Sequence, residues 1–184
     1  MMRVKAAAAA SIAVLVAIGA PARPALAATA GELNRDARSA LNKLYQKQAS
    51  SKVLAQKAKA ILVFPSMVKA GFMFGGQIGE GVLLKGGKPV AYYSSVAASY
   101  GFQAGIQSFG YALFFMNEAA IQQLNATNGF EIGVGPSIVL VDEGIGRSIT
   151  SNTLTSDVYA FIFDQRGLMA GLGIQGSKIS RIQK

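Results

Sequence analysis

Residues 69–82, KAGFMFGGQIGEGV, decide the fold, because apolar side chains alternate there with glycines. The apolar side chains occupy even positions, at Phe72, Phe74, Ile78 and Val82, and glycines occupy the odd positions 71, 75, 79 and 81. A period of two is typical of a β-strand with one apolar face. Glycine within a strand marks a bulge, a bend or the close approach of another backbone. The stretch therefore predicts a strand that bends strongly.

Similar patterns extend through the rest of the chain. The alternation returns at residues 130–140 and 168–174, and further strand candidates are 82–84, 90–95, 100–106, 110–116 and 158–163. Gly86-Gly87 predicts a hairpin turn, and Asn128-Gly129 a turn or loop boundary. Residues 142–152 are polar and are expected to form an exposed loop. Long strands bent at glycines allow a small sheet to curl on itself.

Helical periodicity precedes this β-rich part. Residues 31–60 contain no proline and place apolar side chains on one helical face, at Leu33, Ala37, Ala40, Leu41 and Leu44. Either Thr29 or Gly31 is suited to cap this helix, and either Ser50 or Ser51 to begin a second helix over 52 to about 60, before Pro65. Residues 118–124 predict one more short helix. The fold class is therefore α+β: two N-terminal amphipathic helices and one short inserted helix on a curled antiparallel sheet or partly closed β-barrel.

The N-terminus has the pattern of a secretory signal peptide. Arg3 and Lys5 precede an apolar stretch of about 15 residues, shorter than the roughly 20 that span a bilayer. Cleavage is expected after Ala27 or Ala30. Residues 28–184 then form a single domain with a charge of +6, since the removed segment carries three cations and no acid. We expect an exported protein, periplasmic or secreted, that associates peripherally with a membrane.

Composition restricts the chemistry. The 184 residues include no His, Cys or Trp, so imidazole bases, thiol nucleophiles and the usual zinc sites are excluded. We expect a non-enzymatic protein without a metal or cofactor. The GxGxxG at 171–176 has no helix or acid after it, and the SxxK at 66–69 lacks the partner motifs of serine acylases. The charge-free stretch 89–117 contains too many serines and glutamines to face lipid, so it predicts two strands rather than a membrane span.

A basic stretch suggests a binding surface. Seven cations fall between residues 35 and 59 with Asp36 as the one acid: Arg35, Arg38, Lys43, Lys47, Lys52, Lys57 and Lys59. Such a helix either presents a solvated polar face or lies on an anionic bilayer, its cations at the headgroups and its apolar face, with Leu33, Leu41 and Leu44, inserted. The same apolar stripe is equally suited to pack on the sheet.

The chain from about Lys52 to Ile182 resembles the SYLF domain family. The resemblance rests on AKAI at 58–61, VKAGF at 68–72, GEGVL at 79–83, GFQAG at 101–105, FFMN at 114–117, Gly135-Pro136 and RGLMAG at 166–171. Gly86-Gly87-Lys88-Pro89 stands where the family often has a Trp-containing turn, and Phe109 where an acid is common.

The resemblance implies lipid binding through the basic N-terminal part and, in some members, actin binding. Lys69 matches the family's KAGF element, where it either contacts a headgroup or closes the strand end. For an exported protein the expected partner is an anionic phospholipid, with no nucleic acid. The alternatives are a carrier of a small hydrophobic ligand, with Tyr92, Tyr93, Tyr100 or Asp157 at the mouth of a cavity, or a protein-interaction or envelope-structural module with an unknown partner.

Overall fold

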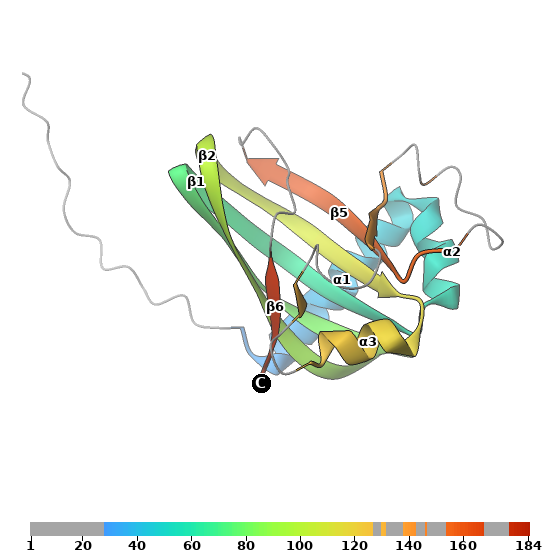
Figure 1. Ribbon diagram of the computed structural model, residues 1–184. Helices are drawn as coiled ribbons and strands as arrows, with labels where there is room; N and C mark the ends of the chain where they lie inside the picture. Colours follow the sequence, from blue (N-terminus) through green and yellow to red (C-terminus); the bar gives the residue numbers. More distant parts are fainter. Residues whose placement is uncertain (1–27, 127–129, 132–137, 143–145, 147–153, 168–176) are drawn as a thin grey trace, which may run out of the picture.

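A strongly curled six-stranded sheet carries helices on both of its faces (Figure 1). The computed structural model describes residues 28–126, 130–131, 138–142, 146, 154–167 and 177–184. The predicted signal peptide, the Asn128-Gly129 turn and the strand candidate 168–174 lie outside these residues, as do most of the 130–140 candidate and of the polar stretch 142–152. The predicted fold class, helices on a curled sheet, is confirmed. In the described part of the chain, no helix combines the length and apolar character needed to cross a bilayer.

Two helices begin the described chain. Helix α1 (Ala30–Lys47) starts at Thr29, which confirms one of the two predicted caps. The Thr29 hydroxyl accepts from the Glu32 backbone N–H at 3.3 Å, and the Glu32 carboxylate accepts from the Thr29 N–H at 2.9 Å. This capping box satisfies amide groups that the first helical turn leaves unpaired. Helix α2 (Ala49–Lys57) begins at Gln48, so the prediction of a Ser50 or Ser51 cap is wrong. The Ser51 hydroxyl instead donates to the Gln48 carbonyl at 2.6 Å, from inside the helix.

One very long hairpin forms the centre of the sheet. Strand β1 (Ala60–Lys85) pairs antiparallel with β2 (Lys88–Phe115). The predicted turn at Gly86-Gly87 is confirmed, and both glycines have positive φ angles, 56° and 75°, which side-chain-bearing residues rarely adopt. The separate strand candidates between 82 and 116 are therefore parts of two continuous strands. Pro65 does not interrupt the chain but lies at a bulge of β1.

The hairpin folds back over itself. Register shifts interrupt the pairing between Phe64 and Met67 and again near residue 73, where the strands bend. The far half of β1 then approaches its near half at Gly81, where an added Cβ would lie 2.7 Å from the Phe64 ring and 2.9 Å from the Val63 carbonyl oxygen. The glycines of the 69–82 stretch therefore permit close backbone approach, as the sequence predicted.

Shorter strands extend the sheet on either side of β2. Strand β5 (Val158–Gly167) pairs antiparallel with the second half of β2, and β6 (Lys178–Ile182) pairs antiparallel with the first half. Strand β3 (Phe130–Glu131) pairs antiparallel with β6 at one edge of the sheet, and β4 (Ile138–Leu140) pairs parallel with β5 at the other. Helix α3 (Glu118–Leu124) matches its predicted range, and the Asn117 side chain accepts from the Ala120 N–H at its start.

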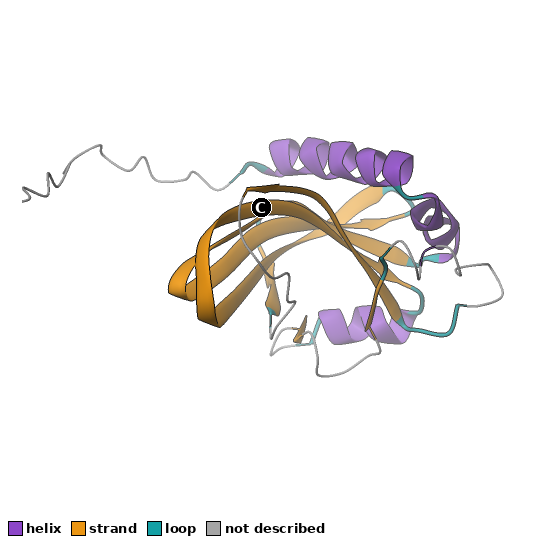
Figure 2. Ribbon diagram, turned by 90° about the horizontal axis from the view of Figure 1, so that it is seen from above, coloured by secondary structure: helices purple, strands orange, loops and turns teal. Residues whose placement is uncertain are grey.

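The curled sheet has a core on each face. Figure 2 shows α1 on the outer, convex side and α3 on the opposite, concave side. The concave core contains large buried side chains such as Phe64, Met67, Tyr93 and Tyr111. The convex core joins the apolar stripe of α1 to Val63, Val82, Phe114 and Phe161 of the sheet. Alternate residues of each strand therefore contribute to different cores.

Candidate functional site

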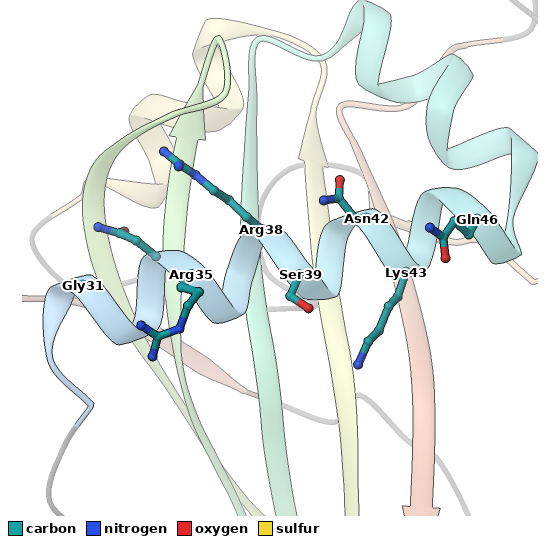
Figure 3. Close-up of a pocket in the computed structure, with 8 residues that line it drawn as sticks. Gly31, Arg35, Arg38, Ser39, Asn42, Lys43 and Gln46 are labelled. Atoms are coloured by element: carbon teal, nitrogen blue, oxygen red, sulfur yellow. The ribbon is translucent and has the colours of Figure 1, made fainter.

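The outward face of α1 forms a shallow polar depression on the convex side of the molecule (Figure 3). Its lining residues are Gly31, Asn34, Arg35, Arg38, Ser39, Asn42, Lys43 and Gln46. The helix crosses the strands, and its side chains leave it in two directions. Arg35 and Lys43 extend along the strands toward the end of β5, whereas Arg38 extends from the opposite flank of the helix.

The apolar stripe of α1 is buried and does not reach the surface. Leu33, Leu41 and Leu44 are 4%, 8% and 0% exposed, and they pack with Val63 and Phe114 of the sheet. The prediction that these leucines form a membrane-inserting face is therefore wrong for this fold. The physical reason is that the convex face of the sheet offers an apolar partner, so the stripe is removed from water within the domain itself.

Two cations of α1 are ion-paired with the sheet. Lys47 Nζ donates to Asp164 Oδ1, and Lys43 Nζ lies 3.8 Å from Asp164 Oδ2. The hydrogen bond from Lys47 lowers the pKa of the Asp164 carboxyl, and the charges of Lys47, Lys43 and Arg166 lower it further. Asp164 lies at a bulge of β5 with φ of 52°. The basic stretch is thus partly neutralised on the β5 side.

The remaining predicted cations divide into two groups. Arg35 and Arg38 on α1, Lys52 and Lys57 on α2, and Lys59 after α2 all have exposed side chains. Lys69 is different, because it is only 5% exposed and lies within β1 on the concave side, opposite Gln107 of β2. Lys69 is therefore neither a surface cation nor the end of a strand, and both predictions for it are wrong.

Lys69 belongs to a buried polar layer inside the curled sheet. Gln77, Ser95 and Gln107 are also less than a tenth exposed there. The Ser95 Oγ and Gln107 Oε1 atoms have no hydrogen-bond partner among the described residues. Tyr111, whose hydroxyl is likewise unpartnered there, is buried deeply enough to raise its pKa well above the usual range.

The described side chains among those predicted to line a ligand cavity lie on both faces of the sheet. Tyr92 packs on the convex side, where its hydroxyl accepts from Asn34 Nδ2 at 3.1 Å. Tyr93 lies in the concave core, and its hydroxyl donates to Asn125 Oδ1. Asp157 accepts from Asn117 Nδ2 at 2.7 Å, next to α3. The side chain of Tyr100 lies outside the described ones. Tyr92 therefore lies on the opposite face of the sheet from Tyr93, so the two do not share one cavity mouth, and the small-ligand carrier stays a prediction.

Sequence reasoning also missed exposed cations outside the basic stretch, among them Arg166 and Lys178. Arg166 on β5 and Lys178 on β6 are both exposed, and both lie beside β2. The alternation of side chains along β6 could have predicted the exposure of Lys178. This residue precedes the buried Ile179 and therefore points away from the concave core. Arg166 follows the bulge at Asp164, and the extra residue of the bulge shifts the alternation of side chains between the two faces. Alternation along the sequence therefore does not predict the face from which Arg166 projects.

Residues 96–184 match a family model of the SYLF domain. The model is called Ysc84 and is described as Las17-binding protein actin regulator. The matched part begins in the middle of β2 and includes the GFQAG, FFMN and RGLMAG elements. It does not include α1, α2 or the VKAGF element at 68–72. No curated protein matches the chain.

Proposed function

Because the chain belongs to the SYLF domain family, a family of binding domains, we propose that it is a non-enzymatic module that binds anionic phospholipid membranes. The family model's description speaks of Las17 binding and actin regulation, so lipid and protein partners are both to be considered. The charge distribution of this chain favours the lipid partner.

The observation that carries this proposal is the set of exposed cations on α1, α2 and the segment after them. Arg35, Arg38, Lys52, Lys57 and Lys59 all have exposed side chains. Asp36, the one acid in this stretch, lies 3.9 Å from Arg35 across two well-exposed side chains, so the pairing is weak. A cluster of cations with few acids is what the negative potential of an anionic bilayer attracts.

These cations act with α1 held on the sheet. Each Lys or Arg near an anionic surface is worth about 1 kcal/mol, so four engaged cations supply about 4 kcal/mol, close to millimolar affinity. The leucines of α1 add nothing to this, because they are buried. Binding by the cations alone is therefore weak and falls steeply with ionic strength.

The proposed location determines the lipid. A signal peptide at residues 1–27 would export the protein to the periplasm or the exterior, where phosphoinositides and actin are absent. Phosphatidylglycerol and cardiolipin are the corresponding anionic lipids of a bacterial envelope. The proposed partner is therefore the headgroup surface of such a membrane, contacted peripherally.

Vesicle co-sedimentation tests the proposal. The purified protein should sediment with vesicles of phosphatidylglycerol and phosphatidylcholine and not with phosphatidylcholine alone, and added salt should release it. Arg35→Glu and Lys52→Glu should each weaken binding about tenfold at low ionic strength. Arg181→Glu is the matched control, since Arg181 is exposed on β6 opposite Tyr93, on the concave side. Equal sedimentation with neutral and anionic vesicles, or with neither, would exclude the proposal.

Substitution is a sharper test than truncation. A chain beginning near Ser51 would lack α1 and expose Val63, Val82 and Phe114, which α1 covers. Loss of vesicle binding by such a fragment would report loss of the folded domain. The charge variants change only exposed side chains and keep the convex core intact.

A further inference from the structure

Five large aliphatic side chains of the described residues are exposed on the central hairpin. Val90, 48% exposed, lies close to the Gly86-Gly87 turn, and the other four lie farther along the strands. Val68, Ile78, Val96 and Ile106 are 41%, 59%, 51% and 68% exposed. They lie on β1 and β2, beyond the part of the sheet that α1 covers. Single exposed aliphatic residues are common on protein surfaces, whereas several that lie together indicate an interaction site. The relative placement of these four side chains is therefore the relevant question.

All four side chains lie on the convex face. Ile78 is four residues from Val82, which packs under α1, and side chains of a strand return to the same face at every second residue. Val96 is the direct cross-strand partner of Ile78. Ile106 lies in step with Ala112, another residue of the convex core. Val68 lies opposite Ser108, the convex neighbour of Ile106 along β2.

Cations border these aliphatic side chains on three sides. Lys178 of β6 is the cross-strand partner of Val96, and Arg166 of β5 is the partner of Ser108. Directly opposite residues of antiparallel strands share a face, so both cations project from the convex side. On the third side, Arg35 and Lys43 extend from α1 along the strands (Figure 3). The four aliphatic residues and these four cations together are called the convex patch below.

We propose that the convex patch is the surface that enters the headgroup region of an anionic bilayer. This inference rests on the proposed function and specifies which atoms contact the lipid. The aliphatic side chains would replace the buried leucines of α1 as the apolar contact. The long side chains of the surrounding cations can reach phosphate groups while the aliphatic centre sinks below them. In this orientation α3 and the concave side face away from the membrane.

The charges favour a bilayer over a second copy of this chain. Two convex patches placed face to face would bring eight cations together, which opposes self-association. Three acids described on this side lie next to cations: Glu80 pairs with Lys184 at 2.8 Å, Asp164 pairs with Lys47 and Lys43, and Asp36 lies 3.9 Å from Arg35. Arg166 and Lys178 have no acid within ion-pair distance among the described residues. An aliphatic centre with a cationic border therefore fits an apolar layer covered by negative charge.

Single tryptophan variants test the orientation, because the natural chain contains no Trp. Ile78→Trp and Ile106→Trp place a fluorophore in the convex patch, and Gln123→Trp places one on the exposed face of α3. With phosphatidylglycerol-containing vesicles, the two patch variants should shift to shorter wavelength and be quenched by lipids brominated on their acyl chains. Gln123→Trp should show neither change. Binding without a shift at either patch site, or quenching at Gln123 as well, would overturn the inference.

A salt series separates this inference from the proposed function. The double variant Ile78→Ser with Ile106→Ser should lower the vesicle partition coefficient about tenfold at high ionic strength, where attraction between charges is screened. Leu140→Ser is the matched control, because Leu140 is 43% exposed but lies on β4, which contacts β5 at the end remote from Arg166. Anionic binding that is unchanged in the serine double variant would leave the proposed function standing and exclude the convex patch. No binding by the natural protein would exclude both.

Discussion

Replacing Leu44 by alanine tests whether the apolar stripe of α1 belongs to the core or to a membrane contact. Leu44 is completely buried among residues of the sheet and of α2. Leucine-to-alanine changes at such sites cost about 2–5 kcal/mol, the removed methyl groups and the cavity both contributing. For a domain of this size each kcal/mol lowers the melting temperature by about 2–4 °C, so we expect a decrease of about 10 °C in thermal unfolding followed by circular dichroism.

Asn42→Ala is the control for this experiment, because Asn42 lies exposed on the same helix. It should change the unfolding free energy by less than about 0.5 kcal/mol. Vesicle affinity, measured well below the melting temperature, should be the same for Leu44→Ala and the natural protein. If Leu44→Ala keeps its stability and loses vesicle binding, then α1 leaves the sheet to insert its leucines, and the assignment of these residues to the core fails.

Three further substitutions follow from the structure. Asp164→Asn removes the acid that neutralises two lysines, so vesicle binding at low salt should rise about fivefold; asparagine tolerates the positive φ angle. Since ion pairing lowers the pKa of Asp164 in the folded state, its contribution to stability is present above the carboxyl's ordinary pKa and disappears as pH falls through the lowered value, so urea unfolding of Asp164→Asn should depend less on pH in the acid range. Gly81→Ala should destabilise the domain by about 1–3 kcal/mol through contact with Phe64, whereas Gly76→Ala, whose added Cβ meets only a carbonyl oxygen at 3.7 Å, should be neutral or slightly stabilising; equal unfolding midpoints would contradict this reading of the bend. Thr29→Ala should cost about 1 kcal/mol by removing the cap of α1, measured against Ser39→Ala on the exposed face, and a loss no larger than the control's would show that the cap contributes little.

Local signals in the sequence were sufficient for the start of α1 and for α3. The range of α3 and the cap at Thr29 depend on residues only a few positions apart, so the chain itself carries the information. The start of α2 was missed because Ser50 and Ser51 have the side chains of caps, yet the chain leaves helical geometry earlier, at Gln48. There a backbone bond from the Gln48 N–H to the Leu44 carbonyl closes α1 as α2 begins.

Strand β2 was divided too often, because the sequence candidates 90–95, 100–106 and 110–116 left the short segments 96–99 and 107–109 outside any strand. In the structure β1 and β2 continue through such places, and bulges and glycines bend them without ending them. Only the folded hairpin shows that Gly81 faces Phe64 of the same strand. The buried position of Lys69 has the same origin, since its burial depends on strands that are distant in sequence.

The width of α1 decides which apolar side chains of the convex face are buried and which stay exposed. An α-helix is about 10 Å wide, so where α1 crosses a strand it covers about three residues of that strand. Strands β1 and β2 have 26 and 28 residues, and their alternation continues well beyond this cover. Val82 and Ile78 share a face and lie about 13 Å apart along β1, yet Val82 is buried and Ile78 is 59% exposed. The stripe of α1 meets an equally apolar face and becomes core, while the uncovered remainder of that face keeps its aliphatic side chains in water. A surface of this kind with cations along its border is suited to contact with lipid, which is why the apolar part of the proposed membrane binding is assigned to the sheet and not to the helix.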